Sequence, residues 1–188
     1  LGGVLVCDTR VENGIVFHLT NGAVTLGAVS GIVSRDRRRQ LMDHHTAVHV
    51  VGGSARALLG PHIWQAGSNK GARYARIDLT HFSRLSRDEL NRIEDHSNDV
   101  ISSNVVVEKL EMPRAEADET FGFELYQGGP PKSSQIRVIK IGDHDVQACG
   151  GTHHDRVGKI GDLRIIRSSQ VQDGVERLQI VAGETARE

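Results

Sequence analysis

Two pairs of side chains in this sequence have the types and the spacing of metal ligands. His45 and His49 lie in the segment MDHHTAVHVVGG, and Cys149 and His153 lie in QACGGTHHDR. Histidines at positions i and i+4 of a helix point from one face, so both can reach the same ion. The glycines between Cys149 and His153 let a loop fold tightly around that ion. If the two pairs meet, a thiolate and three imidazoles form a donor set that suits Zn²⁺.

The role of such an ion is left open by the ligands alone. Four protein ligands close a tetrahedron, which is typical of a structural zinc site, whereas a catalytic site keeps a position for water or substrate. A catalytic ion can lower the pKa of a water molecule to ~7, or it can hold the substrate in place. Because His153 ends a flexible glycine loop, we expect it to be the least firmly held ligand. No serine nucleophile with a local base is found.

Length and composition indicate an intracellular globular chain. Its 188 residues are 38% hydrophobic and 25% charged, and a formal net charge of −1 argues against non-specific coating of nucleic acid. Two cysteines beside ten histidines favour a reduced or metal-bound thiol over a disulfide scaffold. Without a signal peptide or an apolar run of ~18–20 residues, we expect a cytoplasmic monomer with no membrane partner. The leucine start leads us to expect a domain excised from a longer polypeptide.

The hydrophobic pattern changes near residue 35, which predicts two parts. Residues 1–35 have β-branched stretches broken by Asn13-Gly14 and Asn21-Gly22, a pattern typical of short β-hairpins and of the remnant of a small β-barrel. Residues 36–188 are expected to form a zinc-containing domain. The fold class is α+β, with an antiparallel sheet and two main helices around the zinc site.

The expected helices and strands of the second part follow from periodicity and from stop signals. One helix starts at Arg35 and ends at Gly60-Pro61, and another starts at the Ser86–Glu89 capping box. A short helix is expected over 113–121, with proline at its first position. A turn is expected from Gly67 to Gly71. The expected strands cover 72–80, 104–112 and 135–142, with two more joined around 172–174.

Five short motifs resemble the editing domain of alanyl-tRNA synthetases. They are HHTAVH, QAGS, RIDLTH, ACGGTH and QDGVERLQIVAG, and the resemblance runs from about Val29 to Gly183. The chain is also similar to free-standing trans-editing relatives, and more distantly to the editing domain of threonyl-tRNA synthetases. The resemblance implies hydrolysis of the ester that links serine or glycine to the 3′ end of tRNA(Ala). A pocket built for alanine cannot exclude the smaller glycine by sterics and rejects the slightly larger serine poorly, so a second, hydrolytic site is needed.

The resemblance also implies roles for individual residues. The four residues of the two pairs match the family's ligands for one zinc ion, and Gln65 of QAGS matches its active-site glutamine. Asp78 of RIDLTH and the loop Gly150-Gly151-Thr152 are further candidates for contact with the substrate. Candidate tRNA contacts, which are equally consistent with a solvated surface, are Arg35, Arg37, Arg38, Arg39, Lys70 and Arg73.

Two classes of function remain open at the level of the sequence. The first is an editing hydrolase, acting on mischarged tRNA(Ala) either in cis with the remainder of a synthetase or as a free-standing protein. The second is a zinc-stabilised tRNA-binding module without catalysis. Removal of the metal would unfold a structural module, whereas an enzyme with a catalytic ion would largely keep its fold.

Overall fold

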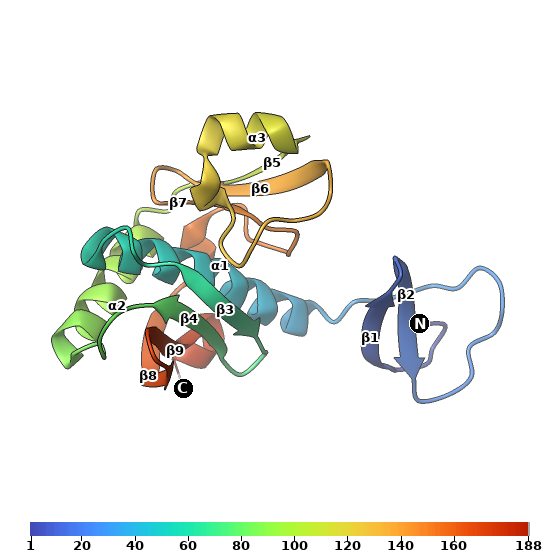
Figure 1. Ribbon diagram of the computed structural model, residues 1–188. Coiled ribbons are helices and arrows are strands. Elements are labelled where there is room, and N and C mark those ends of the chain that lie inside the picture. The colour runs from blue at the N-terminus through green and yellow to red at the C-terminus, as the bar shows by residue number, and fades with distance from the viewer. Residues whose placement is uncertain (188) are drawn as a thin grey trace. The chain divides into compact units, whose positions relative to one another are not determined.

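In the computed structural model, which describes residues 1–187, the beginning of the chain forms one antiparallel hairpin (Figure 1). Its strands are β1 (Val6–Glu12) and β2 (Ile15–Thr20), and Asn13 and Gly14 make the turn with φ of 51° and 78°. Asn21-Gly22 does not form a second turn of this kind, because neither residue has a positive φ; the Asn21 side chain accepts a hydrogen bond from the Leu5 amide at 3.1 Å. Residues 1–38 thus hold one hairpin rather than the several expected, and no barrel is seen there.

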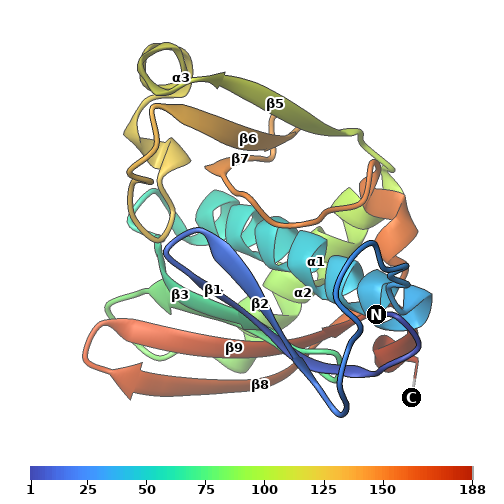
Figure 2. The same cartoon turned by 90° about the vertical axis from the view of Figure 1, so that its right-hand side faces the viewer.

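The chain divides into two compact units, Leu1–Arg38 and a larger unit that begins at Arg39. The larger unit has two antiparallel sheets, with strand orders β3-β4-β9-β8 and β5-β6-β7, as the α+β prediction requires. Figure 2 shows helix α1 (Arg35–Leu59) running between these sheets. The strands are β3 (Gln65–Lys70), β4 (Ala75–Thr80), β5 (Val107–Pro113), β6 (Gln135–Ile141), β7 (Asp145–Ala148), β8 (Leu163–Gln172) and β9 (Val175–Ala182).

The middle of α1 is buried on every side, from Thr46 to Ala55 without interruption. A helix that is apolar all round must be covered all round, and both sheets supply that cover. Its valines share one hydrophobic core with Ile77 of β4, Ile180 of β9 and Ile139 of β6. Side chains on successive turns of α1 therefore have fixed positions relative to both sheets.

Of the two glycines in the middle of α1, only Gly53 lies where a side chain would not fit. A Cβ atom at Gly53 would lie 2.6 Å from His144 Nε2 and 2.8 Å from the His144 carbonyl oxygen. A Cβ atom at Gly52 would meet only Ile77 Cδ1, at 3.4 Å, and Gln147 Nε2, at 4.0 Å. Gly53 is thus the position at which the β6–β7 turn makes its closest approach to α1.

The other helices lie close to where the sequence predicts them. Helix α2 (Arg87–Ser102) starts at the expected capping box, in which Ser86 Oγ accepts from the Glu89 amide at 3.2 Å. Helix α3 (Arg114–Phe121) follows Pro113, which is its N-cap residue rather than its first residue. Short 3₁₀ turns are η1 (Phe123–Leu125), η2 (Val157–Ile160) and η3 (Gly183–Ala186). Within residues 1–187, no helix has the length and apolar composition of a membrane span.

Two strands differ from the prediction. The expected turn from Gly67 to Gly71 is wrong, because Gln65–Lys70 forms β3, the edge strand paired with β4. The QAGSNK segment lacks the β-branched alternation of a strand, and its extended form depends on backbone pairing with β4. The four-residue strand β7 was not predicted, because it is too short to show a period.

The close approach at Gly53 predicts a difference between two neighbouring alanine substitutions. Gly53→Ala is expected to lower the free energy of unfolding by about 1–3 kcal/mol, because the new methyl group overlaps His144. Gly52→Ala is the matched control. It is expected to be neutral, or to stabilise by up to about 1 kcal/mol, because alanine is the better helix former. Urea unfolding followed by circular dichroism measures both, and equal midpoints would contradict this packing.

Candidate metal centre

The four predicted metal ligands lie together beside α1. Their ligand atoms, from His45, His49, Cys149 and His153, are all within 4.8 Å of one another. Cys149 Sγ lies 3.4 Å from His45 Nε2 and 3.4 Å from His153 Nε2. Two of these residues come from consecutive turns of α1, and two come from the loop after β7. The fold therefore brings together side chains that are more than 100 residues apart in the chain, since 104 positions separate His45 from Cys149.

These separations fit a single tetrahedral ion. Zinc takes sulfur at ~2.3 Å and nitrogen at ~2.0–2.1 Å, so a tetrahedral site places its sulfur and nitrogen ligands ~3.5 Å apart. The two sulfur–nitrogen separations of 3.4 Å agree with that value. Among residues 1–187, no other group of three or more histidine, cysteine or acidic side chains has a comparable arrangement. The cluster can hold a metal ion.

Residues next to the ligands hold the loop on α1. Asp43 Oδ1 accepts a hydrogen bond from His154 Nε2 at 2.6 Å, and Thr46 Oγ1 accepts one from the His154 amide at 3.2 Å. Gly151 approaches α1 so closely that a Cβ atom there would lie 1.9 Å from His45 Cε1. The register of the loop on the helix is thus fixed on both sides of His153.

Asp145 lies behind His49 and was missed by the sequence analysis. Its Oδ2 atom is 3.0 Å from His49 Nδ1, and its carboxylate is fully buried. Gln147 Nε2 donates to Asp145 Oδ1 at 3.0 Å, and the Arg56 guanidinium lies 3.6 Å from the same oxygen. Metal-binding histidines commonly have such a carboxylate partner, which fixes the tautomer and orients the ring. With Nδ1 engaged, Nε2 of His49 is left for the ion.

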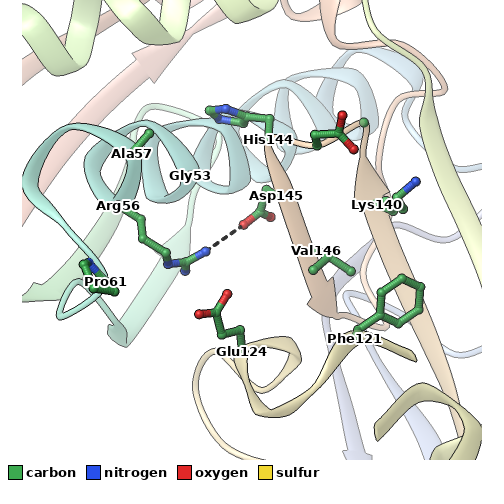
Figure 3. A pocket seen from close by; sticks show the side chains of 12 residues that line it. Gly53, Arg56, Ala57, Pro61, Phe121, Glu124, Lys140, His144, Asp145 and Val146 are labelled. Atoms are coloured by element: carbon green, nitrogen blue, oxygen red, sulfur yellow. Dashed lines mark ion pairs between the residues drawn. The ribbon is translucent and has the colours of Figure 1, made fainter. Parts of the chain in front are cut away.

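A cavity of about 500 Å³ opens on the far side of Asp145 (Figure 3). Arg56 extends across it toward Asp145, and Glu124 faces Arg56 from the opposite wall. The lining includes Asp145 but, within the described part of the chain, none of the four ligands. The cavity therefore adjoins the residue that orients His49 and not the ligand cluster itself.

The surroundings set the charge of each ligand. Burial would lower the pKa of His49, but the hydrogen bond to Asp145 outweighs it and raises the pKa to about 9. Burial would raise the pKa of the Cys149 thiol, but contacts with His153, His45 and His49 bring that pKa far below its usual range. Burial also lowers the pKa of His45, and lowers that of His153 to about 4. At neutral pH, Cys149, His45 and His153 are thus in the forms that bind metal, whereas His49 carries a proton on Nε2 that an incoming ion must displace.

Gln65 lies on the face of β3 that is turned toward α1. Residues directly opposite in antiparallel strands share a face, and Gln65 pairs with Leu79, a core residue. The backbone N–H of Gln65 donates to Gln127 Oε1 at 2.9 Å, which fixes the beginning of β3. This places the predicted active-site glutamine on the same side of the sheet as the helix that carries His45 and His49.

Lys70 lies at the other end of the same face, opposite Ala75. The His44 ring donates to the Gly71 carbonyl at 2.6 Å, which ties this end of β3 to α1 next to His45. Lys70 Nζ is half-buried and donates to Ser68 Oγ at 2.7 Å. Burial lowers the pKa of Lys70, and the Cys149 charge opposes that effect. The sequence predicts Lys70 only as a tRNA contact, and the structure places its charge beside the ligand cluster.

The structure does not bring Asp78 to the cluster. Asp78 pairs with Gly67 on the opposite face of the sheet and accepts two hydrogen bonds from Arg177, at 2.7 and 2.9 Å. Gly150, Gly151 and Thr152 form the loop between Cys149 and His153, and their amides have no protein acceptor within residues 1–187. The remaining candidates are exposed, on the first turns of α1 or in the β3–β4 turn: Arg35, Arg37, Arg38, Arg39 and Arg73.

Comparisons with known proteins relate the chain to aminoacyl-tRNA synthetases. Residues 136–179, which include Cys149 and His153, match the family described as the threonyl and alanyl tRNA synthetase second additional domain. The chain is 46% identical over 182 residues to the alanine–tRNA ligase of Natronomonas pharaonis, covering 96% of the chain and 19% of that relative. It is 44% identical over 189 residues to the alanine–tRNA ligase of Methanopyrus kandleri, covering 100% of the chain and 21% of the relative. The chain thus spans about a fifth of the length of these relatives.

The contact between Asp145 and His49 predicts a role for Asp145 in metal affinity. Asp145→Asn keeps the size of the side chain but removes its charge, and we expect metal affinity to fall about 10–100-fold. Asp143→Asn is the matched control, because Asp143 is exposed and lines the same cavity. Competition with a chromophoric chelator measures zinc affinity, and the visible spectrum of the cobalt form reports the coordination. Equal affinities of the two variants would contradict the assigned role.

Proposed function

We propose that this chain, which belongs to the alanyl-tRNA synthetase family over nearly all of its length, is an editing domain that hydrolyses mischarged tRNA(Ala). The amino acids removed are serine and glycine. One observation carries the proposal: the four ligands meet beside α1, and the face of β3 turned toward that helix bears Gln65 and, at the end tied to His44, Lys70. The match of residues 136–179 to the second additional domain supports it.

We assign the ligand cluster to one Zn²⁺ ion. A thiolate with three imidazoles is a borderline-soft donor set, which suits zinc better than the oxygen-seeking magnesium or calcium ions. When bound, the ion supplies Lewis acidity beside the ester. His153 is the ligand that we expect to yield most easily, because its buried Nδ1 has no protein partner within residues 1–187, whereas His49 is held by Asp145.

The reaction adds water to the ester carbonyl, breaks the bond between the acyl carbon and the ribose oxygen, and releases the amino acid and free tRNA. The Gln65 amide group can both donate and accept hydrogen bonds, so it can orient the aminoacyl group or the attacking water. The amides of the loop Gly150-Gly151-Thr152 are available as donors to the carbonyl oxygen as it gains negative charge. The positive charge of Lys70 also stabilises the negative charge that develops on this oxygen.

The partners in this proposal are tRNA(Ala) and the remainder of a synthetase in cis, in the cytoplasm. The chain matches about a fifth of each ligase relative, which supports action as one part of a larger enzyme. We assign residues 36–188 to the editing domain and residues 1–35 to a preceding β-rich region. The amino-acid activation carried out by a ligase would require other parts of such an enzyme.

A zinc-stabilised tRNA-binding module is the second candidate function. A set of four protein ligands is typical of structural zinc sites, and two of these ligands, His49 and His153, are buried. In that case the ion would hold the β7 loop against α1 and would take no part in a reaction. The two candidates make opposite predictions for metal removal.

The editing proposal predicts metal-dependent and selective hydrolysis. We expect the chain to deacylate Ser-tRNA(Ala) but to leave Ala-tRNA(Ala) intact, and we expect chelation to stop hydrolysis with little change in circular dichroism. Gln65→Ala should lower the rate by about 10²-fold, because it removes a group that contacts the reacting ester. Loss of the fold on chelation, with no hydrolysis by the zinc-loaded chain, would instead establish the structural module.

The position of Lys70 predicts a separate effect on the chemical step. Lys70→Met keeps most of the apolar stem but removes the charge, so we expect kcat to fall about tenfold or more with little change in KM. Arg73→Met is the matched control, since Arg73 is an exposed cation three residues away. Steady-state deacylation of Ser-tRNA(Ala) separates the two parameters. If both variants changed only KM, Lys70 would be a tRNA contact and not a group that acts on the ester.

A further inference from the structure

Two aromatic rings stack where η1 meets the beginning of β3. The ring centroids of Trp64 and Phe123 are 5.8 Å apart, and the two planes differ by 22°. Phe123 is 70% exposed, although it is a large apolar side chain. Tyr126 meets Phe123 edge-on at 6.0 Å and is itself buried, so the exposed ring has a fixed support. Phe123 thus presents most of its ring to solvent, and Trp64, stacked on it, is half-buried.

This surface adjoins the predicted active-site glutamine. Trp64 directly precedes Gln65 in the chain, and the segment after Phe123 packs against Gln65. Gln127 accepts a hydrogen bond from the Gln65 amide at 2.9 Å, and a Cβ atom at Gly128 would lie 3.3 Å from Gln65 Nε2. Trp64 is thus bonded to Gln65 in the chain, and the segment that carries Phe123 is hydrogen-bonded to Gln65, the residue that we place at the ester.

A second group of rings continues the surface away from Gln65. His62, His81 and Phe82 have ring centroids 4.5–5.3 Å apart, and Phe82 is 79% exposed. Thr80 connects the two groups, because its hydroxyl donates to the His62 carbonyl at 2.6 Å and accepts from the Trp64 amide at 2.8 Å. The group of His62, His81 and Phe82, in which His81 is buried and Phe82 exposed, is thus joined to Trp64 through Thr80.

We propose that the Trp64–Phe123 pair is a stacking platform for the unpaired nucleotides that precede the terminal adenosine of tRNA. The inference rests on the proposed function, which requires that adenosine to lie at Gln65. The nucleotides before it are single-stranded, and proteins bind single strands by stacking bases on aromatic rings. The occupant is therefore an RNA 3′ end.

Trp64 is the one tryptophan of the chain, so its emission reports directly on this surface. The probe is a single-stranded RNA that ends in ACCA and carries no amino acid. It is titrated into the full chain, with a blunt RNA duplex as control. We expect the single strand to quench Trp64 and the duplex to have little effect. Phe123→Ala should weaken binding about tenfold and Phe123→Tyr should restore it. Phe17→Ala removes an exposed phenylalanine of β2 and should change nothing.

The same variants are then compared in deacylation of Ser-tRNA(Ala). A higher KM for Phe123→Ala, with kcat unchanged and an unchanged unfolding midpoint, supports the platform. The platform proposal would be wrong if the wild-type chain hydrolysed the ester, RNA did not quench Trp64, and Phe123→Ala had the same KM. The editing proposal would still be supported in that case. The rings would then be a contact for another part of the synthetase. Quenching without hydrolysis would support the platform as an RNA site and count against the editing proposal.

Discussion

Burial of the middle of α1 between two antiparallel sheets is the constraint on which the metal centre depends. A covered helix cannot shift or rotate without opening the core that it shares with Ile77, Ile139 and Ile180. Its successive turns therefore present His45 and His49 at fixed positions, one beside the Gly151 loop and the other beside Asp145. The edge strand β3 is tied to the same helix through the contact between His44 and Gly71. A loop, a strand and a carboxylate are thus all positioned against one rigid element.

Polar groups buried along this helix need hydrogen-bond partners. Their partners distinguish the residues that stabilise the fold from those that can bind a metal ion. Asp43 and Thr46 are satisfied by His154, and Asp145 is satisfied by His49, Gln147 and Arg56. These pairs hold the framework. The thiol of Cys149 and the three imidazoles, in contrast, face one another, and their mutual contacts drive the thiol toward its charged form. A cation is the partner that such a group of donors lacks, which is why we treat the cluster as a metal centre.

Much of the framework and the ligand set could be predicted from local signals. The length of α1, the capping box at Ser86 and the β8–β9 turn at Gly174 each have a short-range signature. The ligands were found because their spacing and types are unusual. Strand β3 and residue Asp145 were missed for one physical reason: both depend on partners far away in the chain. QAGSNK is a strand because β4 lies beside it, and Asp145 matters because His49 is 96 residues earlier. No property of the residues themselves carries that information.

In the proposed reaction, zinc and Gln65 act together on an aminoacyl ester. The most direct test of this joint action is a crystal structure of the zinc-loaded chain with a non-hydrolysable amide analogue of seryl-adenosine. We expect the seryl carbonyl to lie between the ion and the loop Gly150-Gly151-Thr152, with Gln65 in hydrogen-bond contact with the seryl group and Lys70 nearby. The opposite result would be an ion closed in by all four ligands, His45, His49, Cys149 and His153, with no analogue at this position at saturating concentration. Zinc and Gln65 would then not act together on the ester, and the metal would have a structural role.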